Sequence, residues 1–185
     1  MALIVGLGNP GIEYKGTRHN VGFELIDKLS EVLTITLEPG NGLFFLGEGQ
    51  FKGKKVNLMK PVTYMNRSGK AVRKALALTG YSKSECLICY DDIHLEPGTF
   101  RLKPGGSPGG HNGLNDIVTE LNSRDIPRLR IGVGNDFPRG RQSDYVLSPF
   151  DNDQRPLIDE VLGTASEAVL AFLRGGIQLA MNEFN

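Results

Sequence analysis

The sequence predicts an α/β fold in which a mixed, mostly parallel β-sheet is flanked by helices. Short apolar runs alternate with segments of helical spacing, the pattern typical of this class. With 185 residues, 39% of them apolar and 23% charged, the chain has the size and composition of one globular domain. No Pro- or Gly-rich tract is long enough to be a linker, so we expect a single domain over residues 1–185.

Apolar spacing predicts three strands and two helices in the amino-terminal half. Val21, Leu25 and Leu29 recur at helical spacing, which predicts an amphipathic helix. Ser68 is suited to cap a second helix, and Gly80 is suited to end it. The predicted elements are a strand at 3–5, a helix at 20–33, strands at 43–51 and 56–59, and a helix at 68–79.

The carboxyl-terminal half continues the alternation. Its predicted elements are strands at 86–90 and 99–103, a helix at about 113–122, a strand at 129–133, and a helix from 153 to about 183 that breaks at Gly175-Gly176. Cys86 and Cys89 fall within one strand, where residues three apart face opposite sides of the sheet. We therefore expect both to be core thiols in a reducing compartment, not a redox or metal pair.

Charge and hydropathy limit where the protein can be located and which partners it can bind. The apolar run at 2–5 stops at Gly6 and is too short for a signal peptide or a membrane span, so we expect a cytoplasmic protein. The formal net charge is zero, but residues 51–80 carry eight basic and no acidic side chains, and residues 151–185 carry six acidic ones. The basic segment is either a local attractor of polyanions or an ordinary solvated surface.

Gly6-Leu7-Gly8-Asn9-Pro10-Gly11 matches the dinucleotide-binding pattern G-x-G-x-x-G and follows a predicted strand. That motif requires its third glycine to open a helix whose N-terminus faces the pyrophosphate. Helical spacing begins only at about residue 20. We therefore expect the rim of an active site here and no nucleotide site.

Polar side chains gather in four loops, each after a predicted strand, and these loops are expected to converge on one rim. His19 has an unperturbed pKa of about 6.5, which suits a general base. An aspartate leaving a buried strand, as in Asp91-Asp92, can hydrogen-bond a histidine and fix its tautomer. Asn66 precedes one helix, and His111 and Asn112 precede another. Because no Ser or Cys stands in a nucleophile setting, the inventory favours water attacking an acyl carbon.

Two other interpretations remain open at this point. A divalent metal is one, with five possible ligands: His19, Asp91, Asp92, His94 and His111. Phosphate binding by the glycine-rich loop at 105–113 is the other, although the Gly-Lys-Ser/Thr of a P-loop is missing. The basic residues flanking these loops that could meet phosphates are Arg101, Lys103, Arg128 and Arg130.

Several motifs occur in a fixed order along the chain. They are Gly6-Leu7-Gly8-Asn9-Pro10-Gly11 with Tyr14, Thr17-Arg18-His19-Asn20-Val21-Gly22, Lys60-Pro61 leading to Tyr64-Met65-Asn66 and Ser68-Gly69, Asp91-Asp92, and Gly109-Gly110-His111-Asn112-Gly113. Over residues 3 to about 134 they resemble the bacterial-type peptidyl-tRNA hydrolases. The resemblance implies a monomeric esterase with one mixed-sheet catalytic domain and no metal or cofactor. Its substrate would be peptidyl-tRNA released when ribosomes drop off early.

The resemblance also implies a role for each matched residue. His19 would be the general base, and Asp91 would orient it. Asn9, Asn66 and Asn112 would hold the peptide backbone or the oxyanion, Tyr14, Tyr64, Met65 and His111 would line the cleft, and Lys103 and Arg130 would grip the tRNA phosphate. His94 and Pro108 depart from the residues common in the family, which leaves the shape of their loops less defined.

Two rival functions are compatible with the motifs. Relatives in plants that resemble this family serve in intron splicing, so a non-enzymatic RNA-binding protein on the same fold is one rival. The other is a metal-dependent hydrolase, which a chelator would inactivate.

Overall fold

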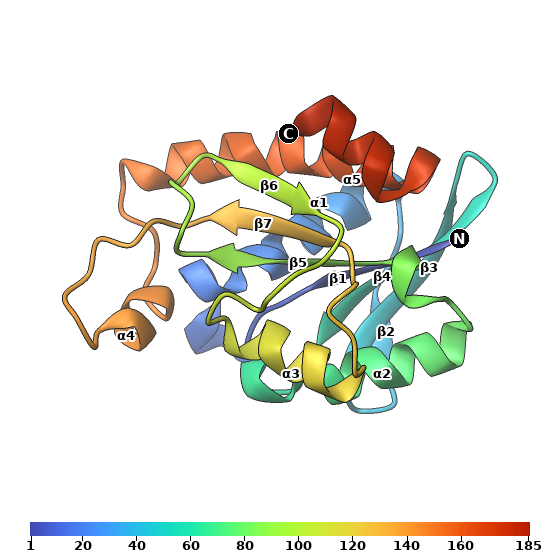
Figure 1. Ribbon diagram of the computed structural model, residues 1–185, viewed down its shortest axis with the longest axis horizontal. Helices are drawn as coiled ribbons and strands as arrows, with labels where there is room; N and C mark the ends of the chain where they lie inside the picture. The colour runs from blue at the N-terminus through green and yellow to red at the C-terminus, as the bar shows by residue number, and fades with distance from the viewer.

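Seven strands form a single sheet in the order β2-β3-β4-β1-β5-β7-β6 in the computed structural model, which describes residues 1–185 (Figure 1). The strands are β1 Ala2–Gly6, β2 Glu38–Gly40, β3 Phe44–Phe51, β4 Lys54–Pro61, β5 Cys86–Asp92, β6 Phe100–Lys103 and β7 Arg128–Gly132. The four central strands β4, β1, β5 and β7 are parallel, whereas β3 and β6 run against their neighbours. The predicted mixed, mostly parallel sheet is confirmed.

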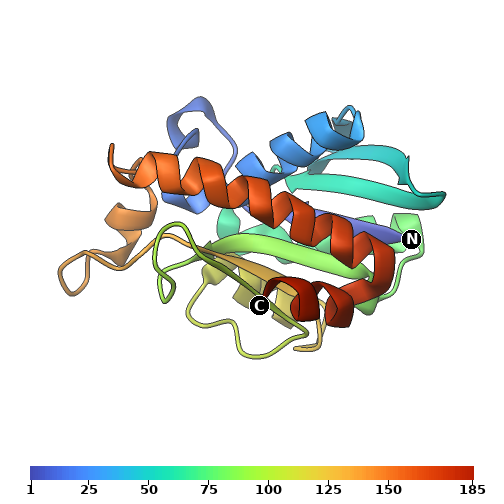
Figure 2. The same cartoon turned by 90° about the horizontal axis from the view of Figure 1, so that it is seen from above.

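Helices cover both faces of this sheet. They are α1 Val21–Leu33, α2 Ser68–Thr79, α3 Asn112–Glu120, α4 Gln142–Val146 and α5 Gln154–Phe184. One apolar cluster joins the sheet to α1 and α5, and a second joins the opposite face to α2 and α3. Figure 2, which views the molecule from above, shows α5 lying along the sheet. None of the helices combines the length and apolar character needed to cross a bilayer.

The predicted elements are all present, with ends that differ by a few residues. The break in α5 is confirmed, because Gly175 and Gly176 leave helical geometry there. Gly80, with φ 72°, ends α2 as expected. Ser68 does not cap α2, however. It is the first helical residue, and its hydroxyl donates to the backbone carbonyl of Met65. The short elements β2 and α4 were not predicted, since segments of three and five residues show no periodic pattern.

The loop before α3 begins at one edge of the sheet, whereas the other polar loops begin at the opposite edge. The loops after the parallel strands β1, β4 and β5 begin at the carboxyl edge of the sheet. Because β6 is antiparallel to β7, it ends at Lys103 beside Arg128, at the amino edge. Residues 104–111 must therefore travel back along the sheet before α3 begins (Figure 1).

Candidate active site

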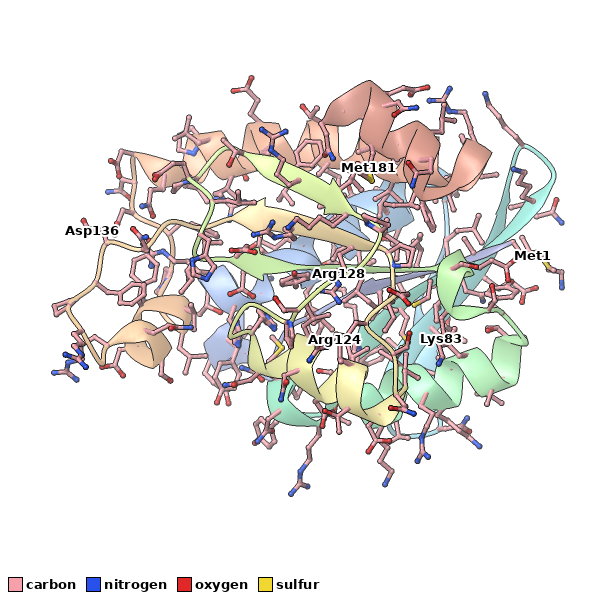
Figure 3. The ribbon with its side chains drawn as sticks, in the orientation of Figure 1. Met1, Lys83, Arg124, Arg128, Asp136 and Met181 are labelled. Carbon is pink, nitrogen blue, oxygen red and sulfur yellow. The ribbon has the colours of Figure 1, made fainter.

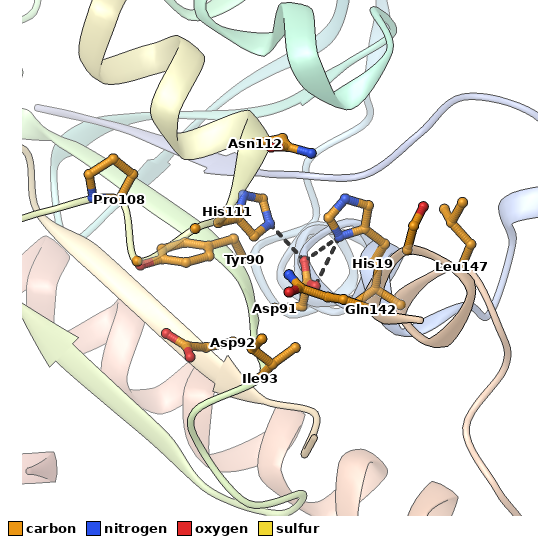
Figure 4. Close-up of a pocket in the computed structure, with 14 residues that line it drawn as sticks. His19, Tyr90, Asp91, Asp92, Ile93, Pro108, His111, Asn112, Gln142 and Leu147 are labelled. Atoms are coloured by element: carbon orange, nitrogen blue, oxygen red, sulfur yellow. Dashed lines mark hydrogen bonds and ion pairs between the residues drawn. The ribbon is translucent and has the colours of Figure 1, made fainter. Parts of the chain in front are cut away.

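Asp91, near the end of β5, contacts two histidines from different loops (Figure 4). Nδ1 of His19 lies 2.9 Å from both carboxylate oxygens, and Nε2 of His111 lies 2.9 Å from Oδ1. Asp91 is only 2% exposed, and the two imidazole rings lie 5.0 Å apart. The contact expected between His19 and Asp91 is therefore present, and His111 joins it.

The hydrogen bonds assign the ring protons. The backbone N–H of Leu114 donates to Nδ1 of His111 at 3.2 Å, so the proton of this ring is on Nε2, which donates it to Asp91. On His19 it is Nδ1 that faces the carboxylate and carries the proton. Nε2 of His19 has no partner in the protein and presents a lone pair. His19 is thus arranged to accept a proton, and His111 to donate a hydrogen bond.

These contacts separate the pKa values of the two groups. Burial alone would lower the pKa of His19, but the charge of Asp91 and the hydrogen bond to it outweigh burial and raise that pKa above its usual value. Burial alone would raise the pKa of Asp91, yet His19 and His111 hold it well below its usual range. Asp91 consequently remains ionised, and His19 becomes neutral only above its raised pKa.

Close packing of α1 on the sheet brings His19 to Asp91. His19 belongs to a 3₁₀ turn that leads directly into α1. A Cβ on Gly22, in the first turn of α1, would lie 2.5 Å from the carbonyl oxygen of Cys89 on β5. Only glycine allows an approach this close, so Gly22 helps set the distance between the turn and β5.

Hydrogen bonds and packing connect the other polar loops to this cluster. The side chain of Asn20 exchanges two hydrogen bonds with the backbone of Asn9, at 2.8 and 2.9 Å. Oδ1 of Asn9 in turn accepts from the backbone N–H of Met65 at 2.8 Å. The thioether of Met65 packs closely on Gly113, where a Cβ would meet its sulfur. The loops after β1 and β4 and the start of α3 therefore form a continuous chain of contacts beginning next to His19.

A cleft of about 350 Å³ opens beside His19 and Asp91 (Figure 4). One wall consists of Pro108, Gly109 and Gly110 in the loop before α3. The opposite wall comes from α4 and the residue after it, with Gln142, Ser143, Val146 and Leu147. Sequence reasoning missed this second wall because its short helix lies in a polar loop without periodic spacing.

Arg18 fastens the α4 wall to the turn that carries His19. Its guanidinium group is almost fully buried and donates to Oγ of Ser148 at 2.6 Å and to the carbonyl of Pro149 at 2.7 Å. It also stacks over the ring of Tyr145, 4.1 Å from the centroid. The turn that carries His19 and the α4 wall are thus held as one unit.

The remaining candidates for substrate contact are distributed around the cleft. Asn112 lines it, whereas Tyr64 and Asn66 are exposed in the loop before α2 and do not. Tyr14 is half-buried in the turn Ile12–Tyr14. Asn9 borders a second hollow of about 620 Å³, between the loop after β1 and α1. The structure therefore gathers the histidines and Asp91 tightly and the asparagines more loosely.

The four basic residues considered for phosphate binding share one face of the β6–β7 pair. Arg101 is opposite Arg130, and Lys103 is opposite Arg128. Lys103 is exposed, while Nε of Arg130 donates to Asp92 at 2.6 Å. The expectation that Arg128 meets phosphate is wrong, because this residue is 1% exposed and bonded to backbone carbonyls.

The five-residue metal site does not assemble. His94 is exposed and approaches the backbone of Gly109, and Asp92 is engaged by a guanidinium. The other three candidates offer ligand atoms within 4.8 Å of one another. A metal on Nε2 of His111 would, however, displace its proton to Nδ1, which already accepts a backbone N–H. The three groups are matched to each other as a hydrogen-bonded set.

Cys86 and Cys89 are core residues, as predicted. Both are fully buried, and they belong to the apolar clusters on opposite faces of the sheet. Burial raises the pKa of the Cys86 thiol to about 12, which leaves it protonated and unreactive at neutral pH.

The glycine-rich segment after β1 is not followed by a helix of the dinucleotide-binding kind. Gly11, with φ 116°, leads into the three-residue turn Ile12–Tyr14, and α1 begins only at Val21. No long helix therefore presents its N-terminus to this glycine-rich turn, in agreement with the prediction.

Comparison with known proteins gives a consistent result. A family model described as peptidyl-tRNA hydrolase matches residues 3–185. A peptidyl-tRNA hydrolase of Salinibacter ruber is 49% identical over 183 residues, covering 99% of this chain and 97% of that protein. One from Caldanaerobacter subterraneus is 46% identical over the full length of both. The crystal structure of peptidyl-tRNA hydrolase from Acinetobacter baumannii superposes with a TM-score of 0.94 at 39% identity, covering 98% of this chain and 93% of that one.

Proposed function

This chain belongs to the peptidyl-tRNA hydrolase family, and from that premise we propose that His19 activates the water that cleaves the ester between a peptide and the 3′-terminal ribose of tRNA. The observation that carries the proposal is the unpartnered Nε2 of His19, in a ring that Asp91 holds beside the cleft. The products, free peptide and free tRNA, would return tRNA from early ribosome drop-off to translation.

The proposed reaction proceeds in two steps. As the water oxygen attacks the ester carbonyl carbon, its proton passes to Nε2 of His19 and a tetrahedral oxyanion forms. The bond to the ribose oxygen then breaks, and that oxygen takes the proton from His19, which regenerates the base. Asp91 stays ionised throughout and stabilises the transient imidazolium through Nδ1.

Amide side chains are proposed to stabilise the oxyanion and hold the peptide backbone. Because Oδ1 of Asn9 is occupied by a backbone N–H, its Nδ2 is the group left to donate to substrate. Asn66 and Asn112 have no side-chain partners in the protein and can turn toward a bound peptide. An oxyanion donor contributes about 10² to 10³ in rate. The residues assigned to the lining of the peptide path are Tyr14, Tyr64, Met65 and His111.

Lys103 and Arg130 are proposed to bind a phosphate of the tRNA. The exposed ammonium of Lys103 is available to solvent. Asp92 occupies only Nε of Arg130, so both terminal nitrogens of that guanidinium remain available for a phosphate. Their position on one face of the β6–β7 pair supports a shared ligand.

We further propose that residues 1–185 act as one catalytic domain, as a monomer in the cytoplasm, without metal or cofactor. The ester of peptidyl-tRNA is already activated, and a positioned histidine base supplies about 10² to 10⁴ in rate. A base, its orienting carboxylate and amide donors therefore form a sufficient set for this reaction.

The deciding experiment measures hydrolysis of N-acyl-aminoacyl-tRNA in the presence of EDTA. Wild-type protein should be active, and His19→Ala should lose at least about a hundredfold in rate. Leu78→Ala, which truncates an exposed side chain of α2 that does not line the cleft, is the control and should keep its activity. Full activity in His19→Ala would refute the mechanism. Inactivation by EDTA would favour a metal, and tRNA binding without hydrolysis would favour an RNA-binding protein.

A further inference from the structure

Arg128 is a buried cation without an acidic partner (Figure 3). Nη1 donates to the carbonyl of Ser107 at 2.6 Å, and Nη2 donates to the carbonyls of Gly106 at 2.5 Å and Arg124 at 3.1 Å. A fourth bond, from Nε, reaches the carbonyl of Ile126 at 3.3 Å. An apolar side chain would fill this place in the sheet without the cost of burying a charge, so the guanidinium has a use beyond filling the core.

Its partners belong to a segment that has little structure of its own. Residues 104–111 lie between β6 and α3, with four glycines among them. Gly106 and Gly110 adopt φ values of 125° and 82°, which other residues rarely reach. A chain so rich in glycine loses much conformational entropy when it is fixed. Arg128 lies where the segment begins its return across the sheet, and binds two consecutive carbonyls there.

The same segment ends in the catalytic cluster. Directly after Ser107, residues 108–110 form one wall of the cleft. His111 follows, with its Nε2 2.9 Å from Asp91 and its ring edge-on to Tyr90, centroids 4.8 Å apart. Tyr90 precedes Asp91 on β5. Where the segment is placed therefore decides whether His111 reaches Asp91.

We propose that Arg128 is a positioning residue for the reaction, whose guanidinium fastens residues 106–107 and thereby holds His111 against Asp91. This inference rests on the proposed function for its effect on rate. The contact it predicts can be measured in the free protein. Arg128 touches neither substrate nor the reacting atoms and acts through the loop.

The consequence for His19 has a definite sign. Four charged or titratable side chains line the cleft with His19: Tyr90, Asp91 and Asp92 on β5, and His111 before α3. Burial raises the pKa of Tyr90 to about 12, so this phenol is uncharged at neutral pH. Asp92 is paired with Arg130, so Asp91 is the group whose charge His19 meets. When His111 no longer donates to Asp91, more of that charge acts on His19. Loss of Arg128 should therefore raise the pKa of His19 further.

The test is a titration of the histidine side chains by NMR, which is tractable because the chain has three histidines. In Arg128→Met, which keeps bulk but has no donors, His19 should titrate at a higher pH than in wild type. The chemical shift of the Nε2 proton of His111 should move to the value of a proton without a hydrogen bond. In Arg128→Lys the same changes should be smaller, because one ammonium cannot grip both carbonyls as the planar fork does. Arg124→Met is the control, since its exposed side chain is removed while its backbone carbonyl remains.

A rate measurement accompanies the titration. Arg128→Met should lower kcat for peptidyl-tRNA by about ten- to a hundredfold, because displacement of residues 106–111 disturbs the geometry of the reacting groups. The acid limb of the pH–rate profile should move to higher pH, since the pKa of His19 is raised. If folded Arg128→Met has the same His19 pKa as wild type, the proposal is overturned. If Arg128→Met does not fold, an unchanged His19 pKa in Arg128→Lys overturns it. Because the titration uses free protein, it stays decisive even if wild-type protein fails to hydrolyse the substrate, a result that would count against the proposed function alone.

Discussion

His19 and His111 bind one carboxylate but hold their protons on different nitrogens. His111 donates from Nε2 to Asp91, while its Nδ1 accepts the backbone N–H of Leu114. His19 has no such restraint on Nε2. At the scale of the residue, the backbone at the start of α3 therefore decides which of two neighbouring histidines is free to act as the base.

Asp91→Asn tests the origin of the raised pKa of His19. Removing the negative charge leaves burial as the dominant influence, so the pKa of His19 should fall. A base with a lower pKa is neutral at lower pH, and the acid limb of kcat/KM should move downward. The rate itself should drop, though less than in His19→Ala, because the imidazolium loses its counter-charge while the base remains.

The pH dependence of kcat/KM in wild type and Asp91→Asn measures this effect. In wild type the acid limb should lie above the usual histidine pKa of about 6.5. An acid limb that stays in place in Asp91→Asn would show that Asp91 does not set the proton affinity of the base.

At the scale of the element, the contact of α1 with β5 controls the geometry of the site. Gly22→Ala would place a methyl group 2.5 Å from the carbonyl oxygen of Cys89, which neither backbone can avoid without moving. We expect a loss of about 1–3 kcal/mol in the free energy of unfolding. Because the displaced turn carries His19, the folded variant should also have a lower kcat.

Gly163→Ala in α5 is the matched control for Gly22→Ala. A Cβ there would come no closer than 4.0 Å to the side chain of Lys28. The change should raise stability by about 0.5–1 kcal/mol, the ordinary helix preference for alanine over glycine. Urea unfolding of both variants gives the comparison, and equal stability changes would refute the steric argument.

At the scale of the whole molecule, the basic segment at 51–80 does not become one surface. Lys52 and Lys54 lie at the turn between β3 and β4, and the ammonium of Lys54 donates to two backbone carbonyls directly before the kink in α5. Lys60 is paired with Asp27. These pairings leave fewer basic groups of this segment free for tRNA, so we expect Lys103 and Arg130 on β6 and β7 to be the principal tRNA surface.

Binding of tRNA at several salt concentrations distinguishes these two surfaces. Lys103→Ala should weaken binding and reduce the slope of log affinity against log salt by about 0.7–0.9, the value for one phosphate contact. Lys52→Ala, which removes an exposed lysine at the β3–β4 turn, should leave the slope unchanged. If only Lys52→Ala changed the slope, tRNA binding would have to be assigned to the β3–β4 turn.

The sequence by itself determined the alternation of strands and helices and the core cysteines. These follow from local spacing, which is readable along the chain. The pairing of His19 with Asp91 was predicted from the ordered motifs and their resemblance to a known family. The sequence also singled out His111, although not the nitrogen that His111 uses.

Only the tertiary structure decided the route of residues 104–111, the α4 wall and the function of Arg128. Each depends on a neighbour distant in sequence. Because β6 is antiparallel, the loop after it begins at the amino edge of the sheet and not at the carboxyl edge. Arg18 holds α4 in place through contacts with residues 145–149. Loop carbonyls bind the guanidinium of Arg128, which the sequence offered as a possible phosphate ligand. Local spacing fixes which residues face the core, whereas strand direction and the demand that buried polar groups be paired are settled only when the whole sheet assembles.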